Sequence, residues 1–419
     1  MHRSRFLRLS DIRSWRFLGL VLIVNFHLGV RGLLAADLPP AAPGGLRIIR
    51  RVETNSTQRS SNAVDARPMA STNLQIVQAA SGTATKSEPS APQVARSQPA
   101  AIPFVIPLLI VSFFPTNGTN IDIQLTGDVG GPVVVVQEKT RKLTQEIIGA
   151  LQEGSRYRAY ANPSNQPALI YEVAATIEYF EPLPTKKQFG PDVPMTDYRR
   201  IMERIQIREW VEDKGIKEVW IWGYHGGKLG LWESNMSSPH GDVSNSDCNT
   251  NDLPILKRTY TVYHYNYQRG ASEAVENHVH QIEALLNFVD GRNVTPPDQW
   301  SDLLFWGKFV GSDKSHHIVR PGCGWSHYPP NAIQDYDWAN RVYVQTDMDD
   351  WKPDGSGRKS RINCERWGCD SLKWFVYWMQ HLPGPGNDLE SQGKRLNNWW
   401  TFIGAWDQAM ERSLKLVGD

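Results

Sequence analysis

The residues best suited to chemistry lie on a segment that is predicted to be an amphipathic helix, residues 271–289. At about 100° per residue, its apolar side chains fall on one narrow stripe, formed by Val275, Val279, Ile282, Leu286 and Val289. A second stripe beside it carries Glu276, His280 and Glu283. Side chains three and four residues apart on a helix can share one metal ion or one proton network.

This pattern predicts a divalent metal, zinc or calcium, with His278, His280 and Glu283 as candidate ligands. In a regular helix His278 falls on the other flank of the apolar stripe, so one ion takes both histidines only where the backbone is extended. Two interpretations without a metal stay open. The stripe could be a hydrogen-bonded helix flank, or it could do acid–base work.

A second polar group follows the apolar segment VWIWG. His225, Glu233, His240 and Asp242 lie in a loop rich in Gly and Ser, and loops at the carboxyl ends of strands in an α/β sheet are the usual ligand sites. Trp232 is an apolar neighbour that could raise the carboxyl pKa of Glu233 for general-acid work. The alternative is that Glu233 caps or pairs within the loop.

The two groups are predicted to form one site. Each follows a strand, residues 218–223 or 259–267, and parallel strands end at the same edge of a sheet. We expect His280, Glu283 and Glu233 to converge there. The predicted catalytic residues are Glu233, His225 and His280. The predicted substrate-binding residues are Trp232, Tyr224 and Asp242.

Two other patterns carry weaker signals. The His225–Gly226 step resembles that of clan CD cysteine peptidases, but that family needs a cysteine after the next buried strand, and TYTVYHYNY is followed by none. The run DMDDWKPDGSG has the oxygen ligands and the Gly turn that suit calcium. Its spacing differs from that of the EF-hand loop, which favours a solvated acidic turn.

Signatures of nucleotide binding and of the common hydrolases are absent from the sequence. It contains no P-loop, no GxGxxG after a strand, no GxSxG and no HExxH. A nucleotide cofactor is therefore not expected. The net charge of +1 gives no basic field for nucleic acid.

The positioning elements predict an α/β fold, with a mixed sheet flanked by helices. FVIPLLIVSFF, LIYEVAATIEYF and VWIWG are typical of strands, the second alternating and the third apolar on both faces. Helices are predicted to end at Gly154 and Gly215.

Composition divides the 419 residues into four parts. Residues 1–36 have the arginines, the apolar run and the small residues of a signal peptide, and the apolar run is too short for a stable membrane span. An uncleaved anchor stays an alternative. Residues 37–100, rich in Pro, Ala, Ser and Gln, are predicted to be a disordered linker. Residues 101–290 form the α/β core, and residues 291–419 a loop-rich, aromatic part packed on it.

Cysteine and tryptophan both concentrate after residue 217. Only Trp15 and Trp210 of the 16 tryptophans precede it, and the others are expected to fill a core or to face a sugar-like ligand. An even number of cysteines in an exported chain favours disulfides. We predict the pairs Cys364–Cys369 and Cys248–Cys323.

Several strings together span about residues 100–410: WIWGYH with ESNMSSP, TYTVYHYNYQRG with HVHQIEALL, CGWSHYPPN with DYDWAN, and NCERWGC. In these strings the chain resembles a family of exported microbial proteins of uncharacterised function. The resemblance implies kinship and export and brings no activity with it.

From these patterns we predict a secreted hydrolase that acts on an extracellular polymer, a glycan in preference to a peptide. Two other functions stay open. One is a non-catalytic extracellular binding or surface protein that uses its aromatic C-terminal half for recognition. The other is a metallopeptidase built on the helix histidines.

Overall fold

The structure is a computed structural model that describes residues 46–50, 102–127, 129–187, 194–226, 229–246 and 252–418. The predicted signal peptide, residues 1–36, lies outside the described residues, as does Cys248. Of the predicted linker, residues 37–100, only a strand at residues 46–50 is described.

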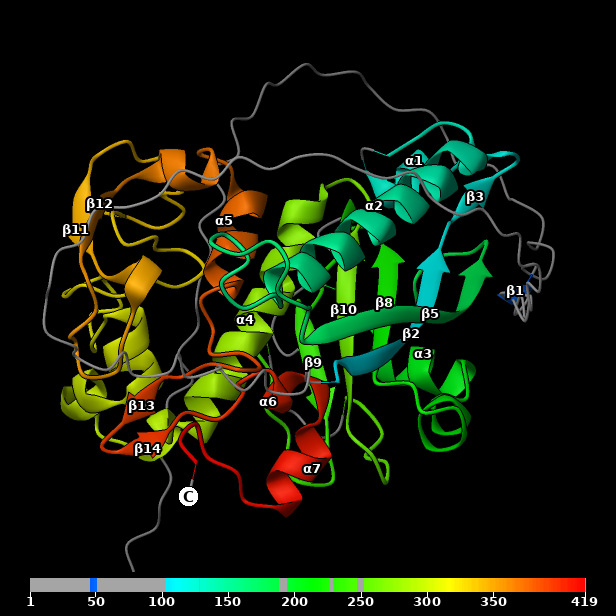
Figure 1. The fold of residues 1–419 in the computed structure, drawn as a ribbon. Helices are drawn as coiled ribbons and strands as arrows, with labels where there is room; N and C mark the ends of the chain where they lie inside the picture. The colour runs from blue at the N-terminus through cyan, green and yellow to red at the C-terminus, as the bar shows by residue number, and fades with distance from the viewer. Residues whose placement is uncertain are drawn as a thin grey trace, which may run out of the picture. The chain divides into compact units, whose positions relative to one another are not determined.

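A six-stranded sheet in the order β1-β5-β2-β8-β10-β9 organises the chain (Figure 1). Its four central strands run parallel: β5 (Leu169–Tyr179), β2 (Phe104–Phe113), β8 (Glu218–Gly223) and β10 (Tyr260–Asn266). The edge strands β1 (Leu46–Arg50) and β9 (Ser234–Ser237) pair antiparallel. The predicted α/β fold with a mixed sheet is thereby confirmed.

Helices cover both faces of the sheet. Successive residues of a strand point to opposite faces, and in β10 Tyr265 contacts His278 of α4 (Ala271–Val289), whereas His264 contacts Tyr198 of α3 (Tyr198–Arg204). The α4 face also carries α2 (Val133–Gly154) and α5 (Ser371–Met379). A strand covered on both sides is expected to be largely apolar. Every residue of β8 is buried, and all but Glu218 are apolar.

The amphipathic pattern of α4 explains how this helix packs on the core. Val275, Val279, Ile282 and Leu286 are all buried in the core. The helix begins at Ala271 after Gly270, whose N–H donates to the Glu273 carboxylate over 3.2 Å. The flank with Glu276, His280 and Glu283 then faces the C-terminal part, which supplies the contacts described below.

Short elements complete the chain. Before α4 they are β3 (Thr116–Asn117), β4 (Asn120–Ile121), α1 (Ile123–Thr126), β6 (Thr185–Lys187), β7 (Pro194–Thr196) and the π-helix η1 (Glu209–Asp213). After α4 they are η3 (Arg292–Val294), η4 (Pro297–Asp302), η5 (Leu304–Val310), β11 (Val344–Thr346), η6 (Met348–Asp350), β12 (Ser360–Ile362), η7 (Cys364–Trp367), β13 (Glu390–Ser391), β14 (Lys394–Arg395), α6 (Thr401–Gly404) and α7 (Trp406–Glu411). Among the described residues, no helix is long and apolar enough to span a membrane.

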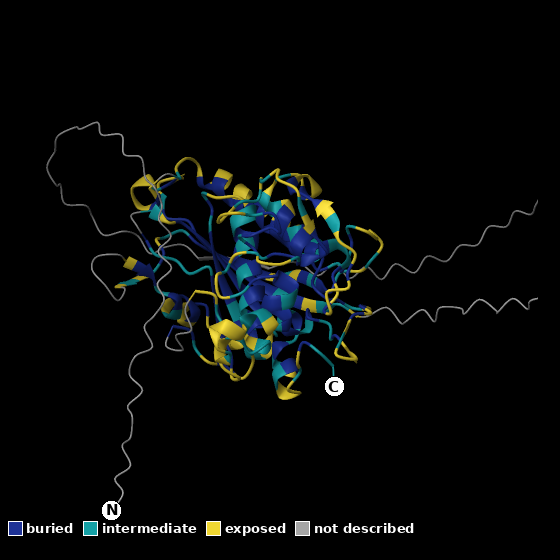
Figure 2. Cartoon of the chain, turned by 90° about the vertical axis from the view of Figure 1, so that its left-hand side faces the viewer, coloured by how far each residue is buried: buried dark blue, intermediate teal, exposed yellow. Residues whose placement is uncertain are grey.

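The C-terminal part has a core built largely from tryptophan. Trp374, Trp378, Trp399 and Trp400 are almost fully buried, and buried residues (dark blue) fill the interior in Figure 2. This part and residues 101–290 belong to one compact unit. For these four tryptophans, core packing is therefore the correct interpretation.

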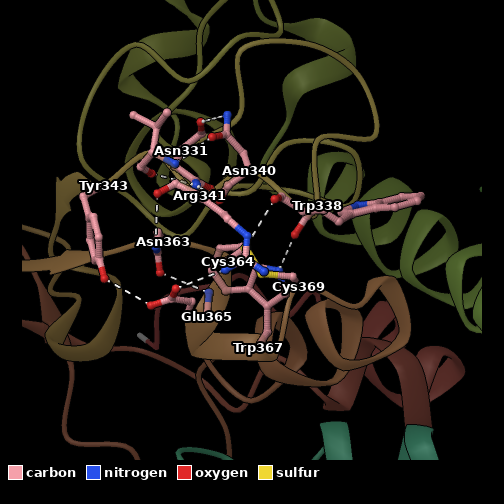
Figure 3. The surroundings of a disulfide bond; sticks show 12 residues. Asn331, Trp338, Asn340, Arg341, Tyr343, Asn363, Cys364, Glu365, Trp367 and Cys369 are labelled. Atoms are coloured by element: carbon pink, nitrogen blue, oxygen red, sulfur yellow. Dashed lines mark hydrogen bonds and ion pairs between the residues drawn. A yellow bond between two sulfur atoms is a disulfide. The ribbon is translucent and has the colours of Figure 1, made fainter.

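One disulfide fixes a corner of this part (Figure 3). Cys364 and Cys369 are bonded, as predicted, with their Cα atoms 4.5 Å apart. Next to the bond, the Trp367 indole N–H donates to the Trp338 carbonyl over 2.8 Å. Cys323 has a free, buried thiol, so the predicted bond from Cys323 to Cys248 is not formed.

Candidate metal centre

Two distant segments bring three potential metal ligands together. Glu276 and His280 lie one turn apart on α4, and His327 comes from the loop after Cys323. One ligand atom from each lies within 4.8 Å of the other two. The His280 and His327 Nε2 atoms are 3.0 Å apart, and Glu276 Oε1 is 3.1 Å from His327 Nε2 and 3.9 Å from His280 Nε2.

These spacings suit a small tetrahedral ion. With bonds of about 2.1 Å, two ligand atoms of a tetrahedral zinc ion lie about 3.4 Å apart, within the range of the three separations given above. The three side chains are 11–17% exposed, so they are screened from water but still reachable. The group could hold a metal ion.

A carboxylate lies near the Nδ1 atom of each histidine, on the side of the ring away from the group of ligand atoms. Glu233 Oε2 lies 2.8 Å from His280 Nδ1, and Asp335 Oδ1 lies 3.5 Å from His327 Nδ1. When each ring is neutral and carries its proton on Nδ1, each Nε2 has a lone pair on the side of the Glu276 carboxylate. Three such acceptors repel one another unless a proton or a cation lies between them. The carboxylates of Glu233 and Asp335 therefore favour a positive charge at this point, either a proton or a cation.

The pKa values of His280 and Glu233 reflect their pairing. Burial by itself would lower the pKa of His280, but the hydrogen bond and charge of Glu233, helped by Glu283 and Glu276, raise it to about 9. Burial would raise the pKa of Glu233, but the hydrogen bond and charge of His280 lower it, with help from His327 and Asn245. Glu233 is thus an ionised partner of His280, and the expectation of a raised pKa is wrong. The ring of Trp232 stacks on Tyr198 instead.

Glu283, a predicted ligand, holds the loop that carries His327. It is buried and accepts hydrogen bonds from the Ser326 backbone N–H (2.7 Å) and hydroxyl (3.2 Å). The Ser326 carbonyl in turn accepts from the indoles of Trp338 and Trp374. Glu283 therefore positions the neighbour of His327 and is not one of the three grouped ligands.

His278, the other predicted ligand, lies on the sheet-facing flank of α4. Its Nε2 is 2.6 Å from the Tyr265 hydroxyl, and its ring stacks on Tyr263 with centroids 3.7 Å apart. Burial lowers its pKa well below the usual range. A regular helix sends residues 278 and 280 in different directions, so the prediction of His278 as a ligand is corrected to a core histidine.

A cavity of about 400 Å³ opens beside the metal group. It lies where β8 and β10 end and α4 begins, and its lining includes His225, Glu233, Glu276, Tyr336 and Trp338. The structure thus brings together His225, Glu233 and His280, the three predicted catalytic residues, at this edge of the sheet. His225 is exposed.

The three predicted substrate-binding residues are not among those that line this cavity. Tyr224 is buried, and its hydroxyl accepts from the Leu183 N–H over 3.1 Å. Asp242 closes a turn by accepting from the Ser238 N–H over 2.9 Å. Trp232 is stacked on Tyr198, as described above. Each of these side chains holds the local fold beside the site.

Three of the four aspartates in the acidic run at residues 347–354 have partners in nearby segments of the chain. Asp350 and Asp354 accept backbone N–H groups of Arg358 and Ser356, and Asp349 pairs with Arg366 over 2.7 Å. No metal group is found in this run among the described residues. An acidic turn, rather than a calcium loop, fits these contacts.

Sequence reasoning missed His327, Asp335 and Tyr336. They lie in a loop without periodicity, about forty residues after the end of α4. Their only signal was the clustering of histidine, aspartate and aromatic residues in WSHYPPNAIQDYDW.

Comparison of the chain with protein families, with curated proteins and with solved structures found no match in any of the three. The fold and the site therefore define the chain as an α/β protein with a His/Glu group at the carboxyl edge of its sheet. Any function must be inferred from that geometry.

Proposed function

We propose that the protein is a secreted, zinc-dependent hydrolase that cleaves an acyl bond, an ester or an amide, on an extracellular polymer, a glycan in preference to a peptide. The observation that carries the proposal is the group of Glu276, His280 and His327 beside an open cavity. Three protein ligands with room for a fourth are typical of catalytic zinc sites.

The ligand chemistry favours zinc over calcium. Two imidazoles and one carboxylate suit zinc, whereas calcium takes six to eight oxygen ligands. A bound zinc ion would supply a polarised carbonyl and a water of lowered pKa. The chain itself orients the rings of His280 and His327 through Glu233 and Asp335.

The state of the Glu233 carboxylate also helps to decide which kind of bond is cleaved. Hydrolysis of a glycosidic bond uses two carboxyl groups, one of them a protonated acid. Glu233 is ionised against His280 and is poorly suited to that role. Cleavage of an ester or amide needs no such acid at this position. The aromatic wall of Tyr336 and Trp338 suits a sugar ring next to the scissile bond.

Metal content tests the proposal most directly. We expect the full chain to bind one zinc ion, and the His327→Ala variant to bind zinc at least tenfold more weakly. His240→Ala is the matched control, because His240 lies near Asp407 and outside the cavity lining. Zinc is measured by plasma mass spectrometry after dialysis. A wild-type chain that binds no zinc after reconstitution overturns the proposal.

Substrate screening then tests the reaction. Release of acid from acylated polysaccharides and from peptides by the zinc-loaded chain identifies the bond. Loss of this release in His327→Ala, with retention in His240→Ala, supports hydrolysis at the centre. Zinc binding without release from any acylated polymer favours the second candidate, a binding protein.

The second candidate is a non-catalytic extracellular binding protein. The segment at residues 333–343 exposes apolar side chains to water: Ile333 is 79%, Val342 64% and Tyr343 45% exposed. Contiguous exposed apolar surface is typical of recognition sites, and this segment is the candidate for one.

A further inference from the structure

Tyr336 occupies a special position in the cavity. Its ring centroid lies 4.2 Å from that of His327 and 5.2 Å from that of Trp338, and it lines the cavity with 55% of its surface exposed. Tyrosine combines a large apolar ring with a hydroxyl that can hydrogen-bond a ligand. A tyrosine in this position can therefore contact a molecule that enters the cavity.

The backbone at Tyr336 is held in an unfavourable conformation. Its φ is 62°, in the left-handed region that residues other than glycine rarely adopt. The Tyr336 N–H donates to the His327 carbonyl over 3.1 Å. Asp337 accepts hydrogen bonds from the Ile333 N–H (3.0 Å) and the Asn340 amide (2.6 Å). Such strain persists where the surroundings impose it, and it concentrates at functional sites.

Tyr336 lines the same cavity as Glu276 and Glu233. A phenol keeps its proton near neutral pH, because its ordinary pKa is about 10. Among the described residues, no hydrogen bond to this hydroxyl is formed. Tyr336 therefore offers a neutral donor in the cavity, with its ring against His327, one of the three grouped ligands.

We propose that Tyr336 is a catalytic residue whose hydroxyl donates a hydrogen bond to the carbonyl oxygen of an acyl substrate held at the metal group. The inference rests on the proposed function and adds the residue that recognises the carbonyl group of the substrate. This hydrogen bond strengthens as negative charge develops on the carbonyl oxygen. No proton is transferred, and the tyrosine leaves the step unchanged.

The test uses acetohydroxamate, a small acyl compound that binds metal ions through its oxygens. Its dissociation constant is measured on the zinc-loaded full chain by calorimetry. We expect the Tyr336→Phe variant to bind this probe about five- to tenfold more weakly, because it loses one hydrogen bond. Its zinc affinity, measured by chelator competition, should stay unchanged.

Tyr343→Phe is the matched control. The Tyr343 hydroxyl donates to Glu365 at the surface over 3.1 Å and is not part of the cavity lining. This variant should bind the probe as the wild type does. If Tyr336→Phe and the wild type bind the probe equally well and both bind zinc normally, the role of Tyr336 is overturned and the proposed function is not. Failure of the wild type to bind zinc overturns both this inference and the proposed function.

Discussion

Two histidines on α4 show how strongly local surroundings decide the chemistry of a residue. His278 is enclosed by aromatic rings of the sheet, and burial depresses its pKa. His280, two residues later, faces three carboxylates, and its pKa is raised to about 9. Both were plausible ligands in the sequence. Only the second has its Nε2 beside other ligand atoms.

Glu283 provides a test at the residue scale. Replacing it with Ala leaves the buried Ser326 N–H without its acceptor, so we expect the free energy of unfolding to fall by about 2 kcal/mol. Zinc affinity should fall about tenfold, because Ser326 positions His327. Glu283→Gln keeps one acceptor oxygen and should lose less of both. Denaturant unfolding and chelator competition measure the two effects. Equal stability of Glu283→Ala and the wild type would contradict this role.

At the scale of elements, the loop between Cys323 and Trp338 matters as much as α4. It carries His327 and Asp335, and its far end is tied to the disulfide corner. The Cys364 N–H donates to the Asn340 carbonyl over 3.1 Å, next to the bond from Trp367 to Trp338. The disulfide thus supports one wall of the cavity from outside.

Removal of this disulfide tests that support. For so short a loop, the entropy model predicts a loss of about 2 kcal/mol in the free energy of unfolding. We expect this loss in the Cys364→Ser, Cys369→Ser double variant, measured by thermal and denaturant unfolding. Cys323→Ser is a control for a cysteine outside any disulfide. If the double variant and the wild type unfold at the same denaturant concentration, the disulfide does not contribute to the free energy of unfolding.

The junction of α4 and η5 contains a group sensitive to pH. Asp290 ends α4 and accepts from the Phe305 N–H over 2.7 Å. Burial raises its pKa to about 6, against the smaller opposing effects of backbone N–H groups and Lys308. The folded chain therefore binds a proton between about pH 4 and 6 that the unfolded chain releases.

The raised pKa of Asp290 predicts how the free energy of unfolding changes with pH. Because the folded state holds the proton more tightly, the contribution of Asp290 to stability falls as pH rises from about 4 to 6, and it is lost above that range. In Asp290→Asn this contribution should be absent. We expect the difference in unfolding free energy between the two proteins to change across pH 4–7, measured by denaturant unfolding. A constant difference would refute the assignment.

At the scale of the whole molecule, the candidate metal centre joins two regions of sequence. Glu276 and His280 belong to the α/β core, and His327 belongs to the C-terminal part. An ion bound by all three would link these regions in the folded state and in no other. Binding energy at the centre then becomes folding stability.

This linkage predicts that zinc stabilises the chain. At free zinc about one hundred times its dissociation constant, the gain is about 2.7 kcal/mol. We expect a higher unfolding temperature with zinc than with a chelator, and no such response in His327→Ala. Differential scanning calorimetry makes the measurement. An unfolding temperature of the wild type that is indifferent to zinc would contradict an ion at this position.

The sequence alone determined the features that depend on local periodicity. The apolar stripe of α4, the doubly buried β8 and the short disulfide between Cys364 and Cys369 were all predicted. The proximity of Glu233 and His280 also followed, because each comes after a parallel strand and such strands end at the same edge.

Tertiary structure alone decided which side chains make up the centre. His327 meets α4 from a loop that has no periodic pattern, so no spacing along the chain could place it. The roles of His278 and Glu283 depended on what covers each flank of α4: sheet aromatics on one side, Ser326 on the other. Local pattern sets which residues share a face of a helix, and only long-range packing determines what that face meets.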